Sequence, residues 1–158
     1  IIHTKQKGNI AFSSVVLVLQ KEGFNVFSEI GDYSRIDLIA EKNGIVKTIQ
    51  IKYNKSSNGS VVLKLRKSGP NGYRYTYSEK DVDWFAIYSP VCEKIAWIKS
   101  NEACLNTSQV SIRFDKAKNN QSENIKLIDD YDIKRLLRDF TQDIVPQNND
   151  EDKVQTTT

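Results

Sequence analysis

The sequence predicts a mixed α/β domain, in which a helix packs on a central mixed sheet and a basic hairpin and a closing helix are added. Three observations support this fold class. Apolar residues recur at helical spacing near the start, several later segments alternate apolar and polar residues, and an Asn-Gly pair joins two of those segments. A chain of 158 residues is long enough for one domain with a substantial core.

The first helix is predicted over residues 4–23. Gly23 is well placed to end it, because glycine readily adopts the left-handed backbone conformation found just after a helix. The apolar stripe that faces the sheet consists of Ile10, Ala11, Val15 and Leu19.

The sheet is predicted to begin with strands over 24–30, 35–42 and 45–53. Asn43-Gly44, between the last two, is the residue pair most typical of a two-residue hairpin turn. If that turn is tight, the numbers of paired residues sum to about 87, so Asp37 lies opposite Gln50. Alternation places three apolar side chains of the first hairpin strand on one face, namely Ile36, Leu38 and Ala40.

A second hairpin is predicted over residues 55–77, which are basic and rich in tyrosine. The segment alternates on both sides of a Gly-Pro-Asn-Gly turn, and one face of its second half carries Tyr73, Tyr75 and Tyr77. Further strands are predicted over 82–90, 94–100 and 109–114.

The closing helix is predicted over residues 129–140, with Asp129 or Asp130 as its N-cap. Residues 1–141 thus form a single domain in this prediction. Residues 142–158 have few apolar side chains and are predicted to be a disordered polar tail.

Composition excludes several classes of function. The chain has one histidine, His3, and two cysteines, Cys92 and Cys104, without a CxxC spacing. A zinc site or a Ser–His–Asp triad is therefore not expected, and the cysteines are predicted to be reduced. No apolar run approaches the roughly 18 residues of a membrane span, and the first residues lack the apolar stretch of a secretory signal, so we expect a cytoplasmic protein.

Positive charge is concentrated in the first half of the chain. Residues 1–80 contain 13 Lys and Arg against 6 Asp and Glu, a net charge of +7, whereas residues 81–158 contain 10 against 14, a net charge of −4. This asymmetry indicates an anionic partner, and nucleic acid is the commonest one. A solvated charged surface is the alternative that charge alone leaves open.

A candidate site lies in the hairpin across Asn43-Gly44. With the predicted register, Asp37 and Gln50 are cross-strand neighbours about 5 Å apart at Cβ, and Lys52 lies one pleat further along. Carboxylate and amide oxygens suit a hard cation such as Mg²⁺, and a nearby lysine could activate water or neutralise a phosphate. The pattern predicts metal-assisted hydrolysis of a phosphodiester. The alternative is an ion pair between Asp37 and Lys52 on a half-exposed sheet.

The same residues resemble the signature of PD-(D/E)XK nucleases, a family with a restriction-endonuclease-like core. Ile36-Asp37 stands where Pro-Asp is usual, and Gln50-Ile51-Lys52 stands for (D/E)XK, after a helix that opens with Lys7-Gly8. The likeness extends over roughly the first ninety residues. It is greatest to the restriction-fold homing endonucleases that group I introns encode, a type known from cyanobacteria.

This resemblance implies a Mg²⁺-dependent endonuclease that makes a double-strand break in a long DNA target and so promotes movement of an intron. It implies Asp37 and Gln50 as metal ligands, with the backbone carbonyl of Ile51 as a third. It implies Lys52 as the residue that activates or orients water, and Ca²⁺ as a non-productive substitute for Mg²⁺.

The sequence departs from the family pattern at two positions. Gln50 replaces the usual acid, which removes one negative charge and weakens affinity for a metal, although the homing branch is recognised for this glutamine. Phe12 occupies the position on the first helix where the family often has a glutamate, and a phenylalanine cannot bind a metal. Either the site functions without that acid, or this chain is a catalytically impaired form.

DNA binding is predicted for the basic residues of the 55–77 segment and for others near the site. A two-stranded ribbon fits the major groove, where Lys64, Arg66 and Arg74 could reach base edges or phosphates. Alternatively, the tyrosine face covers a neighbouring subunit, or the ribbon is only a solvated hairpin. The other predicted DNA contacts are Lys5, Lys7, Arg35, Lys55, Lys67 and Tyr73.

A double-strand break requires at least two copies of the chain, because one active site cleaves one strand. We therefore expect a homo-oligomer, either a dimer or a tetramer, and the resemblance favours a tetramer. Two other functions remain open. A Holliday junction resolvase shares the fold but recognises branched DNA, and a degenerate member of the family could be a DNA-binding module without activity.

Overall fold

A five-stranded mixed sheet forms the centre of the molecule in the computed structural model, which describes residues 1–56, 58–106, 108–115 and 123–141. The strand order is β1-β2-β3-β7-β8, with β3 and β7 parallel and every other neighbouring pair antiparallel. The strands are β1 (Asn25–Ser28), β2 (Leu38–Lys42), β3 (Ile45–Tyr53), β7 (Trp84–Ser89) and β8 (Lys94–Lys99). The short helix α2 (Ser100–Ala103) follows β8.

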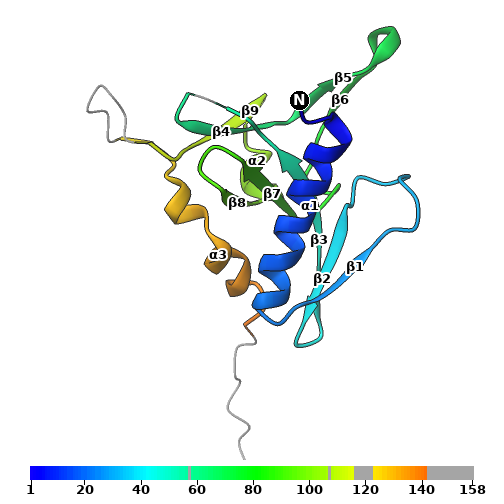
Figure 1. The fold of residues 1–158 in the computed structure, drawn as a ribbon, viewed down its shortest axis with the longest axis vertical. Coiled ribbons are helices and arrows are strands. Elements are labelled where there is room, and N and C mark those ends of the chain that lie inside the picture. The colour runs from blue at the N-terminus through cyan, green and yellow to red at the C-terminus, as the bar shows by residue number, and fades with distance from the viewer. Residues whose placement is uncertain (57, 107, 116–122, 142–158) are drawn as a thin grey trace, which may run out of the picture.

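One face of this sheet is covered by the helix α1 (Thr4–Lys21), which crosses in front of β3 and β7 in Figure 1. Ala11, Val15 and Leu19 are fully buried, as their helical spacing predicts. Ile10, the fourth residue of the predicted stripe, lies at its edge and remains 38% exposed.

Two predicted turns are confirmed by their backbone conformation. Gly23 follows α1 with a φ of +81°, in the left-handed region. Asn43 and Gly44 have φ values of +56° and +76° and join β2 to β3. The register across this turn pairs Leu38 with Ile49, which is the register that the turn predicts.

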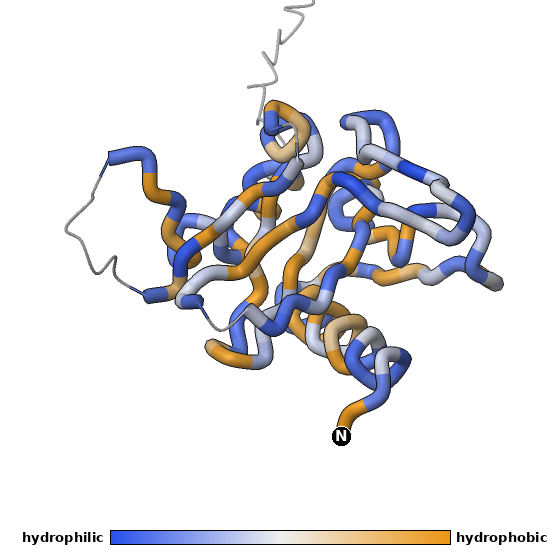
Figure 2. The backbone as a smooth tube through the Cα atoms, turned by 90° about the horizontal axis from the view of Figure 1, so that it is seen from above, coloured by the Kyte–Doolittle hydropathy of each residue, from blue (hydrophilic) through white to orange (hydrophobic). Residues whose placement is uncertain are grey.

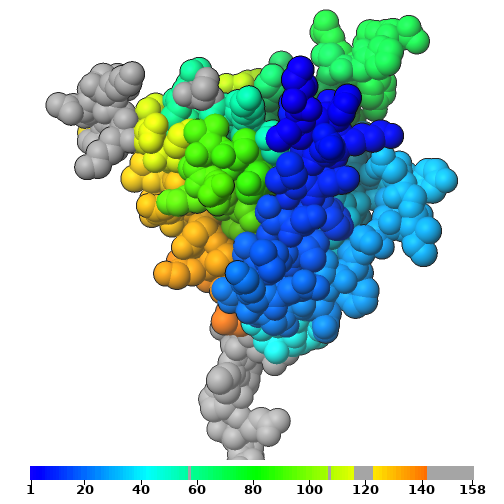
Figure 3. All heavy atoms as spheres, viewed as in Figure 1, coloured from blue at the N-terminus to red at the C-terminus, as the bar shows by residue number. Residues whose placement is uncertain are grey.

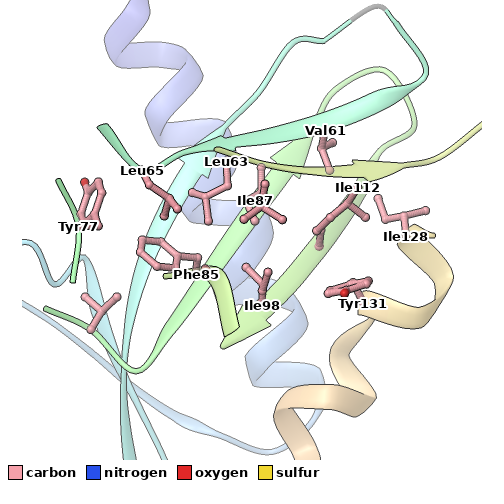
Figure 4. Packing of buried hydrophobic residues seen from close by; sticks show 14 residues of the cluster. Val61, Leu63, Leu65, Tyr77, Phe85, Ile87, Ile98, Ile112, Ile128 and Tyr131 are labelled. Carbon is pink, nitrogen blue, oxygen red and sulfur yellow. The ribbon is translucent and has the colours of Figure 1, made fainter. Parts of the chain in front are cut away.

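The opposite face of the sheet is covered by a smaller two-stranded sheet of β4 (Ser60–Lys64) and β9 (Gln109–Arg113). Figure 2 shows apolar residues gathered in the central strands and polar residues outside them. Because β7 lies between this layer and α1, it is buried on both faces and reads as a continuous apolar run. Figure 4 shows the packing between the two sheets, with Val61, Leu63 and Ile112 over Phe85, Ile87 and Ile98.

The second predicted hairpin is wrong in extent. Within the 55–77 segment, the strand β4 pairs with β9 instead, and this distant pairing buries the apolar side chains of β4 against the central sheet. Only β5 (Arg66–Ser68) and β6 (Arg74–Thr76) pair with each other, across the short turn η1 (Pro70–Gly72). This β5–β6 hairpin projects from the body of the molecule in Figures 1 and 3.

The predicted position of Ile36 is also wrong. The strand β2 begins only at Leu38, so strict alternation does not extend back to Ile36. Leu38 and Ala40 pack on the side of α1, whereas Ile36 packs against the cluster under β4 and β9. The residues before β2 therefore belong to an irregular segment that leads into the sheet.

The closing helix begins later than predicted. Its N-cap is Asp132, which accepts a hydrogen bond from the backbone N–H of Lys134 at 3.0 Å, rather than Asp129 or Asp130. The residues before the cap form a 3₁₀ turn, η2 (Ile128–Tyr131), and the helix itself is α3 (Ile133–Arg138). The predicted apolar face is confirmed, since Ile133, Leu136, Leu137 and Phe140 all pack into the cluster beside α1.

Cys92 and Cys104 are free thiols, as predicted. The predicted tail over residues 142–158 lies outside the described residues. Within the described part of the chain, no helix is long and apolar enough to cross a membrane.

Candidate active site

Asp37 lies directly before β2, where the chain enters the sheet. Its backbone N–H donates to the carbonyl of Ile49 at 2.9 Å. Its carboxylate oxygen Oδ2 accepts two hydrogen bonds, from Nε2 of Gln50 at 2.7 Å and from the backbone N–H of Ile51 at 2.6 Å. The predicted neighbourhood of Asp37 and Gln50 is therefore present.

Asp37 is only partly exposed, and burial raises the pKa of its carboxyl above the ordinary value. The N–H of Ile51 and the charge of Lys52 lower the pKa in the opposite direction but do not cancel the effect of burial. The negative charge is therefore costly in the absence of a cation, as is typical of a carboxylate in a functional site.

Lys52 lies on the same face of β3 as Gln50. Its Nζ atom donates to the hydroxyl of Tyr77 at 2.9 Å and makes no ion pair with Asp37 among the described residues. Burial and then the nearby positive charge of Lys67 lower the pKa of Lys52 to about 8, against the attraction of Asp37. The simple ion pair that was the alternative interpretation is thus not what the structure contains.

Gln50 lies between Asp37 and the hydroxyl of Tyr77, to which Lys52 also donates, and it is only 7% exposed. Its Nε2 donates to Asp37, and its Oε1 accepts a hydrogen bond from the hydroxyl of Tyr77 at 3.3 Å. In this orientation the amide oxygen of Gln50 faces Tyr77 and the amide nitrogen faces Asp37. For Gln50 and Asp37 to bind the same cation, the amide group must rotate by half a turn so that its oxygen faces Asp37. The hydroxyl of Tyr77 permits that turn, because it can accept from the amide nitrogen as well as donate to the oxygen.

The groups beside Asp37 that could bind a cation are oxygens. Both described hydrogen bonds to Asp37 end on Oδ2, and no described residue donates to Oδ1. The N–H and the carbonyl of a strand residue point to the same edge, so the carbonyl of Ile51 points toward Asp37, as its N–H does. Because β2 begins opposite Ile49, no residue of β2 lies opposite Ile51. These groups fit a hard cation such as Mg²⁺.

The donor set contains a single carboxylate. Among the described residues there is no group of three or more His, Cys, Asp or Glu side chains placed to hold a metal ion. Phe12, at the helix position where the sequence resemblance leads us to expect an acid, is partly buried and packs into the cluster beside α1. A cation at Asp37 would thus rely mainly on neutral oxygens, which favours weak binding.

Sequence reasoning missed the place of two residues. Tyr77 was expected only as one of three alternating tyrosines, yet its hydroxyl contacts both Gln50 and Lys52. Lys67 was expected only as a DNA contact, yet its Nζ lies 5.7 Å from the centroid of the Tyr77 ring. The backbone N–H of Tyr77 donates to the carbonyl of Leu65, and the contacts of its hydroxyl with β3 depend on how this end of the hairpin packs on the central sheet.

The other predicted DNA-binding residues divide between the β5–β6 hairpin and separate places. Tyr73 is 57% exposed in the hairpin turn, and Arg66 and Arg74 are exposed on the strands. A groove of about 420 Å³ runs along this hairpin and is lined partly by Arg66, Lys67 and Arg74. The remaining lysines lie elsewhere, with Lys5 and Lys7 in α1, Lys55 after β3 and Lys64 at the end of β4.

Arg35 joins the segment before Asp37 to the hairpin. Its guanidinium carbon lies 3.2 Å from the ring centroid of Tyr75, and its Nη1 lies 4.0 Å from Oδ1 of Asp81. The hydroxyl of Tyr75 donates to the same carboxylate of Asp81. Arg35 is therefore engaged within the chain, with 39% of its side chain exposed.

The strand order of the central sheet, together with the position of Asp37 at the open end of the β2–β3 hairpin, defines a class of protein, the nucleases of restriction fold. The model of the PD-(D/E)XK endonuclease family matches residues 2–134, and the chain belongs to that family. The resemblance seen in the sequence is thereby confirmed.

A solved structure described as a bacterial homing endonuclease, I-Ssp6803I, has the same fold. It superposes with a TM-score of 0.69 and 21% sequence identity, over 85% of this chain and 92% of that chain. A search of curated proteins found no similar sequence.

Proposed function

We propose that this chain is a Mg²⁺-dependent endonuclease that cuts both strands of duplex DNA at a defined sequence, as intron-homing enzymes do. The observation that carries the proposal is the meeting of Asp37, Gln50 and the Ile51 backbone at one point, with the amine of Lys52 beside them. Membership of the PD-(D/E)XK family supports nuclease chemistry, and the similarity in fold is to a homing endonuclease.

In this proposal Asp37, Gln50 and the carbonyl of Ile51 would hold the ion. When bound, Mg²⁺ polarises a phosphoryl group and stabilises the charge that develops on it. Lys52 orients the attacking water or takes its proton, and a pKa of about 8 leaves a usable fraction of neutral amine near neutral pH.

The β5–β6 hairpin is the proposed reader of the target. It projects from the body, carries Arg66, Lys67 and Arg74, and is joined directly to the site by Tyr77. Two short antiparallel strands fit the major groove, where arginine pairs well with guanine edges. The net charge of +7 over residues 1–80 supports contact with phosphates there.

Cutting of both strands requires more than one copy of the chain. We propose a dimer or a tetramer, since the chain carries a single candidate site among its described residues. The resemblance to homing endonucleases favours the tetramer. Light scattering with and without bound duplex measures this number. A strictly monomeric complex that still cuts both strands at once contradicts the assembly.

The test of function uses a library of duplexes of randomised sequence, because the target is unknown. The chain is incubated with the library in Mg²⁺, Ca²⁺ or EDTA, and the cut ends are captured and sequenced. We expect ends that share one long sequence in Mg²⁺ and none in Ca²⁺ or EDTA, and no ends from an Asp37→Asn variant.

A four-way junction and a single strand are the comparison substrates. Cutting restricted to the junction identifies a resolvase instead. Tight binding to duplex without cutting in any metal identifies an inactive DNA-binding module, for which Phe12 and Gln50 are the structural reason.

A further inference from the structure

Tyr77 lies where the β5–β6 hairpin meets the central sheet. Its backbone N–H donates to the carbonyl of Leu65 at 2.8 Å, just past the last residue of β6. Tyr77 is 4% exposed, and its ring makes edge contacts with Tyr75 and Phe85, at centroid separations of 5.4 Å and 5.3 Å. Figure 4 shows Tyr77 at the end of the cluster nearest Phe85 and Leu65. Two ring contacts and a backbone bond thus fix the place of its hydroxyl.

The hydroxyl of Tyr77 touches two of the four candidate site residues. It donates to Oε1 of Gln50 at 3.3 Å and accepts from Nζ of Lys52 at 2.9 Å. Gln50 in turn donates to Asp37 at 2.7 Å. The result is a chain of donors from Lys52 through Tyr77 and Gln50 to Asp37, in which each member limits the orientation of the next.

We infer that Tyr77 is a positioning residue of the active site, which holds the amide of Gln50 and the amine of Lys52 in place beside Asp37. This inference rests on the proposed function of the site. A hydroxyl can donate to the amide oxygen or accept from the amide nitrogen, so it holds Gln50 in either orientation. The hairpin that carries the proposed DNA contacts then also carries part of the catalytic arrangement.

Tyr77→Phe is the direct test, because it removes one oxygen and keeps the ring contacts. Tyr131→Phe is the matched control. Tyr131 is also buried, at 5% exposure, and its hydroxyl donates at 2.8 Å to Glu102, away from the site. Comparison of the two variants separates the loss of a buried hydroxyl from the loss of this particular contact.

The first readout needs neither metal nor DNA. In protein labelled with ¹⁵N-glutamine, the side-chain amide signals of Gln50 are assigned through a Gln50→Glu variant, and their hydrogen exchange is measured. In the native protein we expect slower exchange for Gln50 than for the exposed Gln20. Tyr77→Phe should speed exchange at Gln50 about fivefold or more, whereas Tyr131→Phe should leave it unchanged.

The second readout is the single-turnover rate of cutting of the selected duplex. Tyr77→Phe should lower this rate about tenfold or more with an unchanged dissociation constant for DNA, because a positioning residue acts on the chemical step. Tyr131→Phe should change neither value.

The inference is overturned if the Gln50 signals and the cutting rate of Tyr77→Phe both match those of Tyr131→Phe. It is also overturned if Gln50 exchanges as fast as Gln20 in the native protein, a measurement that does not depend on whether the variant folds. If the native chain cuts no DNA but Gln50 is released by Tyr77→Phe, the positioning role stands and the proposed function fails.

Discussion

Asp37 and Ile51 are joined by a hydrogen bond of 2.6 Å, from the backbone N–H of one hairpin strand to the carboxylate that precedes the other. This bond fixes the carboxylate against β3 at the point where β2 begins. The carbonyl of Ile51 points to the same edge of β3 as this N–H. Geometry and charge can therefore be separated here, since asparagine keeps an acceptor for the N–H and removes the charge.

Asp37→Asn should abolish most cutting without harm to the fold. We expect a fall in the single-turnover rate of at least about a hundredfold, since loss of the ion removes several kcal/mol of transition-state stabilisation. The pKa of Asp37 is higher in the folded protein than its ordinary value of 3.8. The ionised carboxylate therefore lowers the free energy of unfolding at pH values above the folded pKa, and this cost is absent below pH 3.8. Thermal unfolding at pH 7 without metal should therefore show equal or greater stability for the variant. A clearly less stable variant would mean that Asp37 is a structural anchor.

Lys52 should titrate near pH 8 in the metal-free protein, far below the ordinary value of 10.5. A lowered folded pKa means that the stability cost of the ammonium is fully present below pH 8 and disappears as pH rises to 10.5. The free energy of unfolding of the native chain should thus rise across that interval relative to Lys52→Met. Lys67→Gln should move the titration to higher pH, because it removes the neighbouring positive charge. NMR of ¹³C-labelled lysine measures the titration, and a midpoint above pH 10 would contradict this account.

Phe12→Glu should raise Mg²⁺-dependent cutting, because it restores the acid that the family often has on the first helix. Phe12→Gln is the control, since glutamine has nearly the same shape as glutamate but carries no charge. Both variants lose part of the packing of Phe12 in the cluster beside α1, so both should be less stable. Equal cutting rates for the glutamate variant, the glutamine variant and the native chain would show that the helix acid has no role here.

The two exposed arginines of the hairpin should contribute directly to DNA affinity. Arg66→Gln and Arg74→Gln should each weaken binding. Loss of a phosphate contact should lower the slope of log Kd against log salt concentration by about 1, whereas loss of a base contact should relax sequence preference at one position. Lys21→Gln, at the far end of α1, is the control for net charge. Equal effects of all three changes would mean that the hairpin does not read DNA.

The sequence predicts the β2–β3 hairpin well because a local signal determines it. Asn43 and Gly44 tolerate the left-handed conformation that a two-residue turn demands, and the turn alone then sets the register of Asp37 against Gln50. Gly23 ends α1 for the same kind of reason.

Where the sequence fails, distant contacts decide. The pairing of β4 with β9 joins residues more than forty positions apart, for example Val61 with Ile112, and no turn signal indicates it. Ile36 and Asp132 depart from prediction because an irregular lead-in precedes β2 and a 3₁₀ turn precedes α3. Tyr77 was missed for a related reason, since its role depends on how β6 packs on the sheet.

The central claim is that a divalent cation binds between Asp37, Gln50 and the carbonyl of Ile51. The most direct test is a crystal structure with the selected duplex and Ca²⁺, which should bind without cutting. We expect an ion about 2.3–2.6 Å from oxygens of these residues and in contact with a DNA phosphate. A well-ordered DNA complex with no cation at Asp37, or with the phosphates held elsewhere, would contradict the claim.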